Sequence, residues 1–562
     1  MGYNHAITSG HYLATQAGFE ILGAGGNAVD AGVATGIALG VLQSDIVNVA
    51  GVAPMIIWLA AQQKVVSIDG VGGWPKAVTP DFFMKHHKGE IPTGILRTVV
   101  PAAPAAWLTA LERYGTMSFT DVAKAAIGFA RDGFPMYPLM ANHLADNAAL
   151  YRQWDSNRAI YLPNGRPPRV GERFVQADLA ASLQYMADEE RAAARQGRDA
   201  GIAAARNAFY RGDIARKIAA YHQENGGLLT YDDLAGYEAR LAPTVRAAFR
   251  DMTVHCCGPW TQGPALAQSL RLLEPFLADP PASNSPAWIH LVVEALKLAF
   301  ADRERFYGDP DFVDVPLKSL LSDSYSADRR RAIDPEKAHP GVPPSGTAGS
   351  VGQAKPLRLA AAGEDPPAFD TSYVGVVDRW GNAISATPSD VSRNTPVIPG
   401  TGLCPSERGS QSRADPEHPA SVAPGKRPRM TPNPAMAFRG GKPCFVFGSP
   451  GADVQVQAML QVFLNVAVHG MDVQEAIETP RFATYSFPAS FAPNSCFPDR
   501  LNLEPGIGSE TSDSLARLGH KPEWWPEWVW RAGGVCAIQI DQNTGLLSAG
   551  ADPRRPCLAL CC

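Results

Sequence analysis

Thr371 stands where an irregular segment meets a regular one, and its side chain suits nucleophilic catalysis. Residues 339–370 have no periodicity and many glycines and prolines, whereas 371–378 and 383–387 alternate like two strands of a hairpin. A threonine hydroxyl needs a base beside it, and its own α-amine can be that base when the threonine is the first residue of a chain. An α-amine has a reference pKa of about 7.7–8.0, which suits proton transfer near neutral pH. The junction therefore suggests a precursor that is cleaved between Asp370 and Thr371.

A second segment has the composition of an anion-binding turn. In "GSPGAD" (448–453), Gly448 and Gly451 permit a sharp turn after a strand, and a helix is predicted to begin at about Asp453. Backbone N–H groups at a helix N-terminus have no partner within the helix and can hold a negative oxygen. The turn could therefore stabilise the oxyanion of a tetrahedral intermediate. From these residues alone, a phosphate-binding or structural turn remains open, as does a domain linker before an ordinary strand at Thr371.

Periodicity and breakers predict the elements that must position these residues. The chain before residue 335 is rich in helical patterns, and strands become frequent after residue 370. Asn27 is expected to cap a helix whose first turn contains Asp30. The predicted helices lie within 11–42, 102–131, 175–222 and 287–310, paired strands lie within 54–70 and 528–552, and 435–470 reads as strand, turn, strand and helix. Residues 404–428 lack periodicity and predict a long loop.

The overall composition excludes several classes of protein. The 562 residues are 45% hydrophobic with a net charge of −5, so the chain can bury a large core and has no electrostatic reason to bind nucleic acid or a membrane. The nine cysteines include no CxxC pair, which indicates mostly reduced, structural thiols. No signal peptide and no apolar run of membrane-spanning length is visible. We therefore expect a cytoplasmic protein.

Several segments, taken in order, resemble the γ-glutamyltransferase family of N-terminal nucleophile hydrolases. They are residues 9–35, 99–115, 294–316, 370–390, 448–453 and 551–555. The resemblance implies an α+β fold: a four-layer αββα sandwich, with two stacked antiparallel sheets between outer helices. It also implies autocleavage into a large helix-rich subunit (1–370), which ends in the flexible leader 339–370, and a small subunit (371–562). Both subunits would share one core.

The resemblance also assigns roles to single residues. Thr371 would attack the Asp370 carbonyl during processing and then act as the catalytic nucleophile. Ser389 stands where the family has a second hydroxyl residue, although it could instead be an ordinary serine at a strand end. The N–H groups of Gly451 and Ala452 would form the oxyanion hole, with alanine at a position where the family usually has glycine. No metal or organic cofactor is implied.

Four stretches depart from the family where its transferases hold the γ-glutamyl head group. Val71 replaces an arginine, and Met430 with Thr431 replaces a serine pair. Residues 404–412 replace an Asn- and Asp-rich motif, and residues 44–54 replace a glycine-rich loop. Each change removes a polar or charged contact to an amino-acid head group, so we do not expect γ-glutamyl to be the preferred acyl group.

Arg408, in "SERGS", is similar to an arginine of hydrolase-like branches of the family. Its guanidinium could bind a substrate carboxylate through two hydrogen bonds. The predicted substrate contacts are Arg408, Thr431 and the asparagine of "TPNP", which is Asn433 beside Pro432. Weaker candidates, expected to be solvated or structural, are Arg393, Arg427 and Arg429.

Other suggestive residues have ordinary explanations. His290 and Glu294 lie one helical turn apart, but the sequence offers no third metal ligand. His255 beside Cys256 and Cys257 fits a strand with buried thiols. The tryptophans of residues 524–530 could line a pocket or an interface, and packing is the default expectation.

The sequence thus predicts an autoprocessing amidohydrolase with an N-terminal threonine, acting on a small carboxylate-bearing amide through an acyl-enzyme. Its partners would be that amide and the other subunit from the same precursor, with a dimer of heterodimers also possible. One alternative is a γ-glutamyltransferase or glutathione hydrolase, active in glutathione metabolism. Two others are an acylase of larger amides and an unprocessed, non-catalytic binding protein of the same fold.

Overall fold

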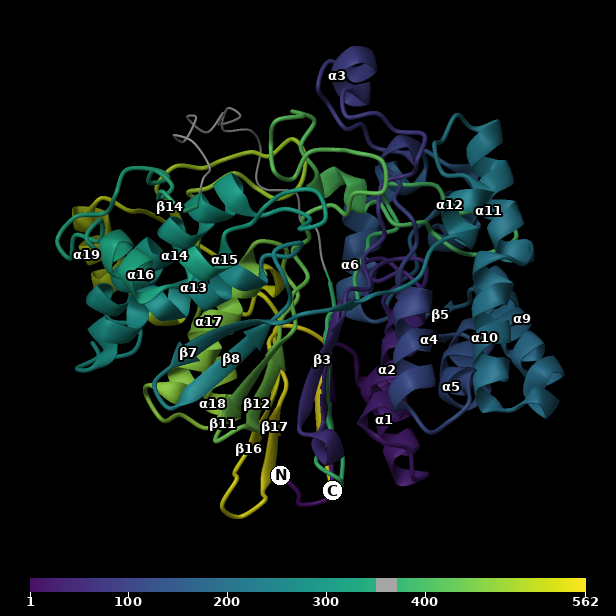
Figure 1. Cartoon of the computed structure of the whole chain (residues 1–562), viewed down its shortest axis with the longest axis horizontal. Coiled ribbons are helices and arrows are strands. Elements are labelled where there is room, and N and C mark those ends of the chain that lie inside the picture. Colours follow the sequence, from purple (N-terminus) through teal and green to yellow (C-terminus); the bar gives the residue numbers. More distant parts are fainter. Residues whose placement is uncertain (350–370) are drawn as a thin grey trace.

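Two stacked antiparallel sheets form the centre of the computed structural model, which describes residues 1–349 and 371–562 (Figure 1). The larger sheet has seven strands. In spatial order they are β18 (Leu558–Cys561), β1 (Ala6–Ser9), β9 (Val374–Val377), β10 (Ala383–Ala386), β2 (Met55–Leu59), β3 (Lys64–Ile68) and β6 (Leu241–Ala242). The predicted cleavage residue Asp370 lies outside the described residues.

The second sheet has six strands, all antiparallel to their neighbours. In spatial order they are β17 (Leu547–Gly550), β16 (Cys536–Ile540), β12 (Lys442–Gly448), β11 (Ala435–Arg439), β8 (Met252–Cys256) and β7 (Val245–Phe249). Two small sheets lie outside the sandwich. They consist of β13 (Phe482–Thr484), β14 (Arg500–Leu503) and β15 (Lys521–Trp524), and of β4 (Phe134–Pro135) with β5 (Arg173–Phe174).

Helices cover both outer faces, as Figure 1 shows. The helices on the side of the larger sheet are α1 (Tyr12–Gly23), α2 (Ala28–Leu42), α4 (Ala103–Tyr114), α5 (Phe119–Asp132), α9 (Ala177–Ala193), α10 (Arg198–Tyr210) and α11 (Asp213–Glu224). Those on the side of the second sheet are α13 (Gly263–Leu273), α14 (Pro286–Phe306), α16 (Asp323–Arg330), α17 (Val454–Ala467), α18 (Val473–Glu478) and α19 (Ser509–Leu518). Shorter helices include α3 (Phe82–His87), α6 (Pro138–Asp146), α8 (Asp155–Tyr161), α12 (Tyr231–Ala235) and α15 (Leu317–Leu320). The predicted αββα sandwich is confirmed. Within the described residues, no helix has the length and apolar character that crossing a membrane requires.

Three apolar layers hold the sandwich together. One lies between the larger sheet and its helices, and includes the almost uniformly buried helix α2. A second lies between the six-stranded sheet and α13, α14 and α17. The third separates the two sheets and contains Ile56, Trp58, Met436 and Ile538. Helices and sheets that are apolar on one face need such partners, which explains the layered order.

Strands from both predicted subunits alternate within one sheet. Strands β9 and β10 follow Thr371, yet they lie between β1 and β2 from the first part of the chain. The second sheet likewise pairs β11 with β8. Any division of the chain at residue 370 would therefore leave two pieces that share one core; the division itself stays a prediction.

Local sequence signals were accurate for several elements. Asn27 caps α2, accepting hydrogen bonds from the N–H groups of Val29 and Asp30, and the Asp30 carboxylate accepts one from the Asn27 N–H. The strands expected within 54–70 are β2 and β3. The predicted hairpin is also present, but β9 begins at Val374, three residues after Thr371. Pro388 lies opposite Ser372 and has no N–H to donate, which interrupts the ladder there.

Candidate active site

The hydroxyl groups of Thr371 and Ser389 meet at the end of the β9–β10 hairpin. Their oxygen atoms are 2.7 Å apart, and the two residues form an isolated antiparallel bridge. Ser389 also exchanges two backbone hydrogen bonds with Val52, at 3.0 and 3.1 Å. Both hydroxyl residues are almost fully buried, with exposed fractions of 1% and 0%. The fold therefore brings the predicted nucleophile and its predicted partner into contact on a rigid sheet.

A glutamine that the sequence did not indicate lies on the other side of Thr371. The amide of Gln455, in the first turn of α17, is 3.3 Å from Thr371 Oγ1. When its oxygen faces the threonine hydroxyl, its nitrogen donates to the carbonyls of Ser449 (3.1 Å) and Thr431 (3.3 Å). That orientation satisfies both ends of the buried amide, so Gln455 can accept the threonine proton in a hydrogen bond. Its place just after "GSPGAD" is the only sequence signal for it.

Thr431 belongs to the same hydrogen-bond network. Its hydroxyl accepts a hydrogen bond from Gln411 Nε2 at 3.1 Å, and its carbonyl accepts one from Gln262 Nε2 at 3.1 Å. The Gln262 amide also donates to the Ala452 carbonyl at 2.9 Å. Thr431 thus connects the loop of residues 404–428 with the turn before α17, as expected for a residue lining the site.

The turn of residues 448–453 leads into α17, whose Gln455 contacts Thr371. Within residues 1–349 and 371–562, no acceptor pairs with the N–H of Gly451 or Ala452. The following helix α17 begins at Val454, close to the predicted Asp453. Two free N–H groups beside a buried nucleophile could stabilise a tetrahedral oxyanion.

Ala452 adopts a left-handed backbone conformation, with φ of 51°. Gly451, at φ of 122°, adopts a conformation suited to glycine. The conformation of Ala452 costs an alanine about 1 kcal/mol, and the surrounding structure maintains it. The next residue, Asp453, helps to maintain this conformation, because its carboxylate accepts hydrogen bonds from Arg303 (2.5 Å) and Ser490 (2.6 Å).

Arg408 lies behind Ser389 and is fully buried. Its guanidinium donates a hydrogen bond to Ser389 Oγ and another to Gln411 Oε1 at 3.3 Å. The ring of Phe491 is 5.4 Å from the guanidinium carbon. The prediction that Arg408 would lie near the nucleophile agrees with this placement; whether it binds substrate stays a prediction.

Two carboxylates and a second arginine surround Arg408. Asp390 Oδ1 is 3.7 Å from Arg408 Nε, and the Asp390 carboxylate accepts hydrogen bonds from Ser406 Oγ and the Glu407 N–H. Glu407 pairs with Arg97 at 3.3 Å. Burial raises the pKa of Asp390 to about 7, with Arg408 lowering it and Glu407 raising it. Apart from the adjacency of Asp390 to Ser389, no sequence signal indicated this cluster.

Other predicted residues lie elsewhere. Asn433 accepts a hydrogen bond from the backbone N–H of Cys257, so its side-chain oxygen holds the start of the 257–263 turn; a substrate contact through its amide nitrogen stays a prediction. Val71 is buried in the core between the sheets, which leaves no arginine at the position where the family has one.

Arg427 pairs with Asp309 at 2.6 Å, and Arg429 pairs with Glu304 at 2.6 Å. Both arginines have the structural roles expected of them.

The histidine and cysteine candidates are explained by packing. His520 joins His290 and Glu294, which corrects the expectation that no third residue would be present. However, Glu294 binds the Lys297 ammonium at 2.8 Å, and the two histidine rings hydrogen-bond to each other at 2.9 Å. A lysine ammonium therefore already balances the carboxylate charge.

The two adjacent cysteines are fully buried. Cys256 is the last residue of β8, and Cys257 follows it. Burial raises the pKa of the Cys257 thiol to about 12.

The stacked sheets between helices are the fold of the N-terminal nucleophile hydrolases. Residues 14–560 match the sequence profile of the gamma-glutamyltranspeptidase family. The chain therefore belongs to the gamma-glutamyltranspeptidase family, and it is an enzyme of that family.

Relatives of known sequence are named as acylases and as glutathione hydrolases. The Acylase ACY 1 proenzyme of Pseudomonas sp. strain SE83 is 33% identical, covering 98% of this chain and 92% of its own. The glutathione hydrolase-like YwrD proenzyme of Bacillus subtilis is 31% identical, covering 99% and 98%. Both relatives are named as proenzymes.

Solved structures give the same fold. The structure titled LmbA2991HD has a TM-score of 0.93 at 34% identity, covering 100% of this chain and 98% of its own. A cephalosporin acylase from Bacillus halodurans has a TM-score of 0.86 at 27% identity, covering 100% and 96%.

Proposed function

We propose that this protein is an autoprocessing amidohydrolase that cleaves a small carboxylate-bearing amide by means of Thr371. The contact that carries the proposal is the 2.7 Å approach of the Thr371 and Ser389 hydroxyls; among the residues that the structure describes, the N–H groups of Gly451 and Ala452 in the turn before α17 have no acceptor. Nucleophile, proton relay and oxyanion hole are the parts that acyl transfer requires. The proenzyme names of two relatives agree with a precursor that is cut.

The proposed reaction proceeds in two stages. The chain is first cut before Thr371, which frees the threonine α-amine to act as base. The Thr371 hydroxyl then gives its proton to that amine and attacks the amide carbon, while the N–H groups of Gly451 and Ala452 hold the oxyanion. The amine returns the proton to the leaving nitrogen, and water hydrolyses the ester that remains. Gln455 and Ser389 orient the hydroxyl throughout.

Arg408 supports the expectation of a carboxylate in the acyl group. It is a buried guanidinium directly behind Ser389, and guanidinium groups bind carboxylates through paired hydrogen bonds. Val71, which is buried, stands at the position where the family has the arginine that binds an α-carboxylate. A single carboxylate near Arg408, without an α-amino group, therefore fits better than a γ-glutamyl head group.

An acylase of larger amides is the second candidate. It is favoured by the names of the ACY 1 acylase and of the Bacillus halodurans cephalosporin acylase, which match across almost the whole chain. A carboxylate-bearing acyl group is compatible with either a small or a large leaving amine. The two candidates therefore differ in the amine side of the scissile bond.

Processing is tested by mass spectrometry of the purified chain. Two fragments that begin at Met1 and Thr371 are expected, and Thr371→Ala should remain intact and inactive. Thr371→Ser should still be cut, because serine keeps the hydroxyl. An intact wild-type chain, or a Thr371→Ala variant with wild-type amidase activity, would overturn the proposal.

Substrate class is tested with three anilides assayed side by side. Glutaryl p-nitroanilide should be hydrolysed faster than its methyl ester, and faster than γ-glutamyl p-nitroanilide with or without glycylglycine. Arg408→Gln should erase the preference for the free carboxylate over the ester. The comparison within one variant controls for the contact of Arg408 with Ser389, since a weakened nucleophile slows both substrates equally. Glycylglycine-accelerated turnover of the γ-glutamyl compound above all others would favour the transferase.

A further inference from the structure

A second cavity opens where both sheets of the sandwich end. Strand β6 is the last strand of the larger sheet and β7 the last strand of the second, and Pro243 and Thr244 connect them. The cavity beside this corner has a volume of about 680 Å³, within the range of small-molecule sites. None of the residues described around Thr371 lines it. Its lining includes residues 240–246, 258–260, 310–311, 315–321 in part, and Arg427.

The body of the cavity is apolar. Val315, Leu317 and Leu321 line it with partly exposed side chains, and Pro259 and Trp260 also border it but are themselves buried. Trp260 is 99% buried and packs against Arg427, whose guanidinium carbon is 5.6 Å from the ring. An apolar wall of this kind suits the hydrocarbon part of a ligand.

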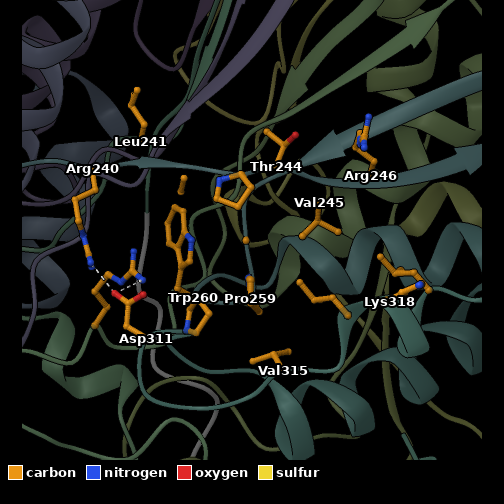
Figure 2. Close-up of a pocket in the computed structure, with 17 residues that line it drawn as sticks. Arg240, Leu241, Thr244, Val245, Arg246, Pro259, Trp260, Asp311, Val315 and Lys318 are labelled. Atoms are coloured by element: carbon orange, nitrogen blue, oxygen red, sulfur yellow. Dashed lines mark hydrogen bonds and ion pairs between the residues drawn. The ribbon is translucent and has the colours of Figure 1, made fainter. Parts of the chain in front are cut away.

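Charges at the two ends of the cavity differ. Figure 2 shows Arg240 and Asp311 at one end, Arg246 and Lys318 at the other, and Trp260 between them. Arg240 is neutralised by Asp311 at 2.6 Å, and Arg427 by Asp309 at 2.6 Å. In the part of the chain that the structure describes, neither Arg246 nor Lys318 forms an ion pair. One end of the cavity therefore carries uncompensated positive charge, in a protein with a net charge of −5.

We propose that this cavity binds a small organic carboxylate with an apolar body. The carboxylate would lie between Arg246 and Lys318, and the hydrocarbon part would pack on Val315, Leu317 and Leu321. Arg246 on β7 and Lys318 on α15 are exposed side chains at the same end of the cavity (Figure 2), so a carboxylate bound there could contact cations from two different elements. A neutral ligand of the same shape would leave this charge uncompensated and would bind more weakly.

The cavity is physically connected to the candidate active site. The Trp260 carbonyl accepts a hydrogen bond from the Met430 N–H at 2.8 Å, next to Thr431. Two residues beyond Trp260, Gln262 donates to the carbonyls of both Thr431 and Ala452. The segment that borders the cavity at residues 258–260 is therefore joined by hydrogen bonds to Thr431 and to the turn at Ala452.

Binding is tested by calorimetry on the Thr371→Ala variant, which cannot turn over an amide. The probe is 4-phenylbutyrate, and 4-phenylbutyramide is its neutral counterpart. A dissociation constant of about 1 mM or below is expected for the acid, given its size, and binding at least about 10-fold weaker for the amide. Equal affinity for the two compounds, or no saturable binding of the acid, would overturn the proposal.

Substitutions of the residues that line the cavity test where 4-phenylbutyrate binds. Arg246→Gln with Lys318→Gln should weaken 4-phenylbutyrate binding by at least about 10-fold, and Val315→Asp should do the same by repelling the carboxylate. The matched control is Lys64→Gln with Lys442→Gln, which removes two exposed charges outside the cavity and should change nothing. Binding that survives the cavity variants but disappears in Arg408→Gln would assign the ligand to the catalytic site and overturn the second site.

Discussion

The hydroxyl oxygens of Thr371 and Ser389 lie 2.7 Å apart, although 18 residues separate them along the chain. The contact exists because Thr371 and Ser389 keep the register of the β9–β10 hairpin beyond its last regular pair. Arg408 donates to the same Ser389 oxygen, so the serine hydroxyl has its proton available for Thr371. Arg408, Ser389 and Thr371 therefore form a buried chain of hydrogen bonds.

Removing the serine hydroxyl should slow both processing and turnover. Ser389→Ala leaves Thr371 without its 2.7 Å partner and removes one of the acceptors of Arg408, so we expect at least about a 10-fold loss in each rate. Ser389→Thr keeps the hydroxyl and should restore most of the activity. Gel densitometry over time measures processing, and anilide hydrolysis measures turnover. Unchanged rates in Ser389→Ala would show that the contact is only structural.

Glycine should replace Ala452 at little cost. Relief of the left-handed strain and the greater freedom of the unfolded glycine oppose each other, so the free energy of unfolding should change by less than about 1 kcal/mol. The N–H donor is kept, and hydrolysis should stay within about threefold. Ala452→Val, with a branched side chain at φ of 51°, should be clearly less stable. Urea unfolding compares the three proteins. A stable valine variant would contradict the strained conformation.

The stability of the protein should depend on pH through Asp390. Burial raises its pKa to about 7 in the folded protein, above that of an unfolded aspartate. The stability this neutral carboxyl provides is therefore complete below the unfolded pKa and is lost as pH rises through 7. Asp390→Asn cannot ionise, so its free energy of unfolding relative to wild type should rise between pH 5 and pH 8, by about 1 kcal/mol or more.

Urea unfolding at four pH values, in the Thr371→Ala background, measures this difference at a constant processing state. Asp279→Asn, at an exposed position, is the control and should show a flat difference. The prediction fails if the Asp390→Asn difference is also flat or falls as the pH rises.

Glu304 should contribute strongly to stability. It is buried among three arginines, with contacts of 3.0 Å to Arg303, 2.9 Å to Arg413 and 2.6 Å to Arg429. Although burial alone would raise its pKa, the three guanidiniums hold it well below the usual range. Glu304→Gln leaves these buried cations undercompensated, so we expect a loss of about 3–5 kcal/mol in the free energy of unfolding.

A half-exposed pair provides the comparison for Glu304. Glu112 contacts Arg206 at 2.5 Å with both side chains partly exposed, and Glu112→Gln should cost less than about 1 kcal/mol. Thermal and urea unfolding of both variants give the two values. Similar small losses in the two variants would show that the Glu304 cluster is not stabilising.

Much of the fold could be predicted from local signals and family resemblance. The cap at Asn27, the strands within 54–70, the hairpin after Thr371 and the turn before α17 depend on residues close together in the chain. Their hydrogen bonds and backbone preferences are local, so a sequence pattern can reveal them. The family motifs supplied the order of layers.

The sequence by itself determined that Thr371 and the 448–453 turn have the chemistry of an acyl-transfer site, and that the γ-glutamyl contacts are absent. Only the tertiary structure decided which side chains surround Thr371. Gln455 contacts Thr371 directly, Arg408 reaches it through Ser389, and Asp390 contacts Arg408 in turn, while the Asn433 side-chain oxygen accepts from Cys257. Such contacts join residues distant in the chain, and only the packing of two sheets against their helices sets their distances.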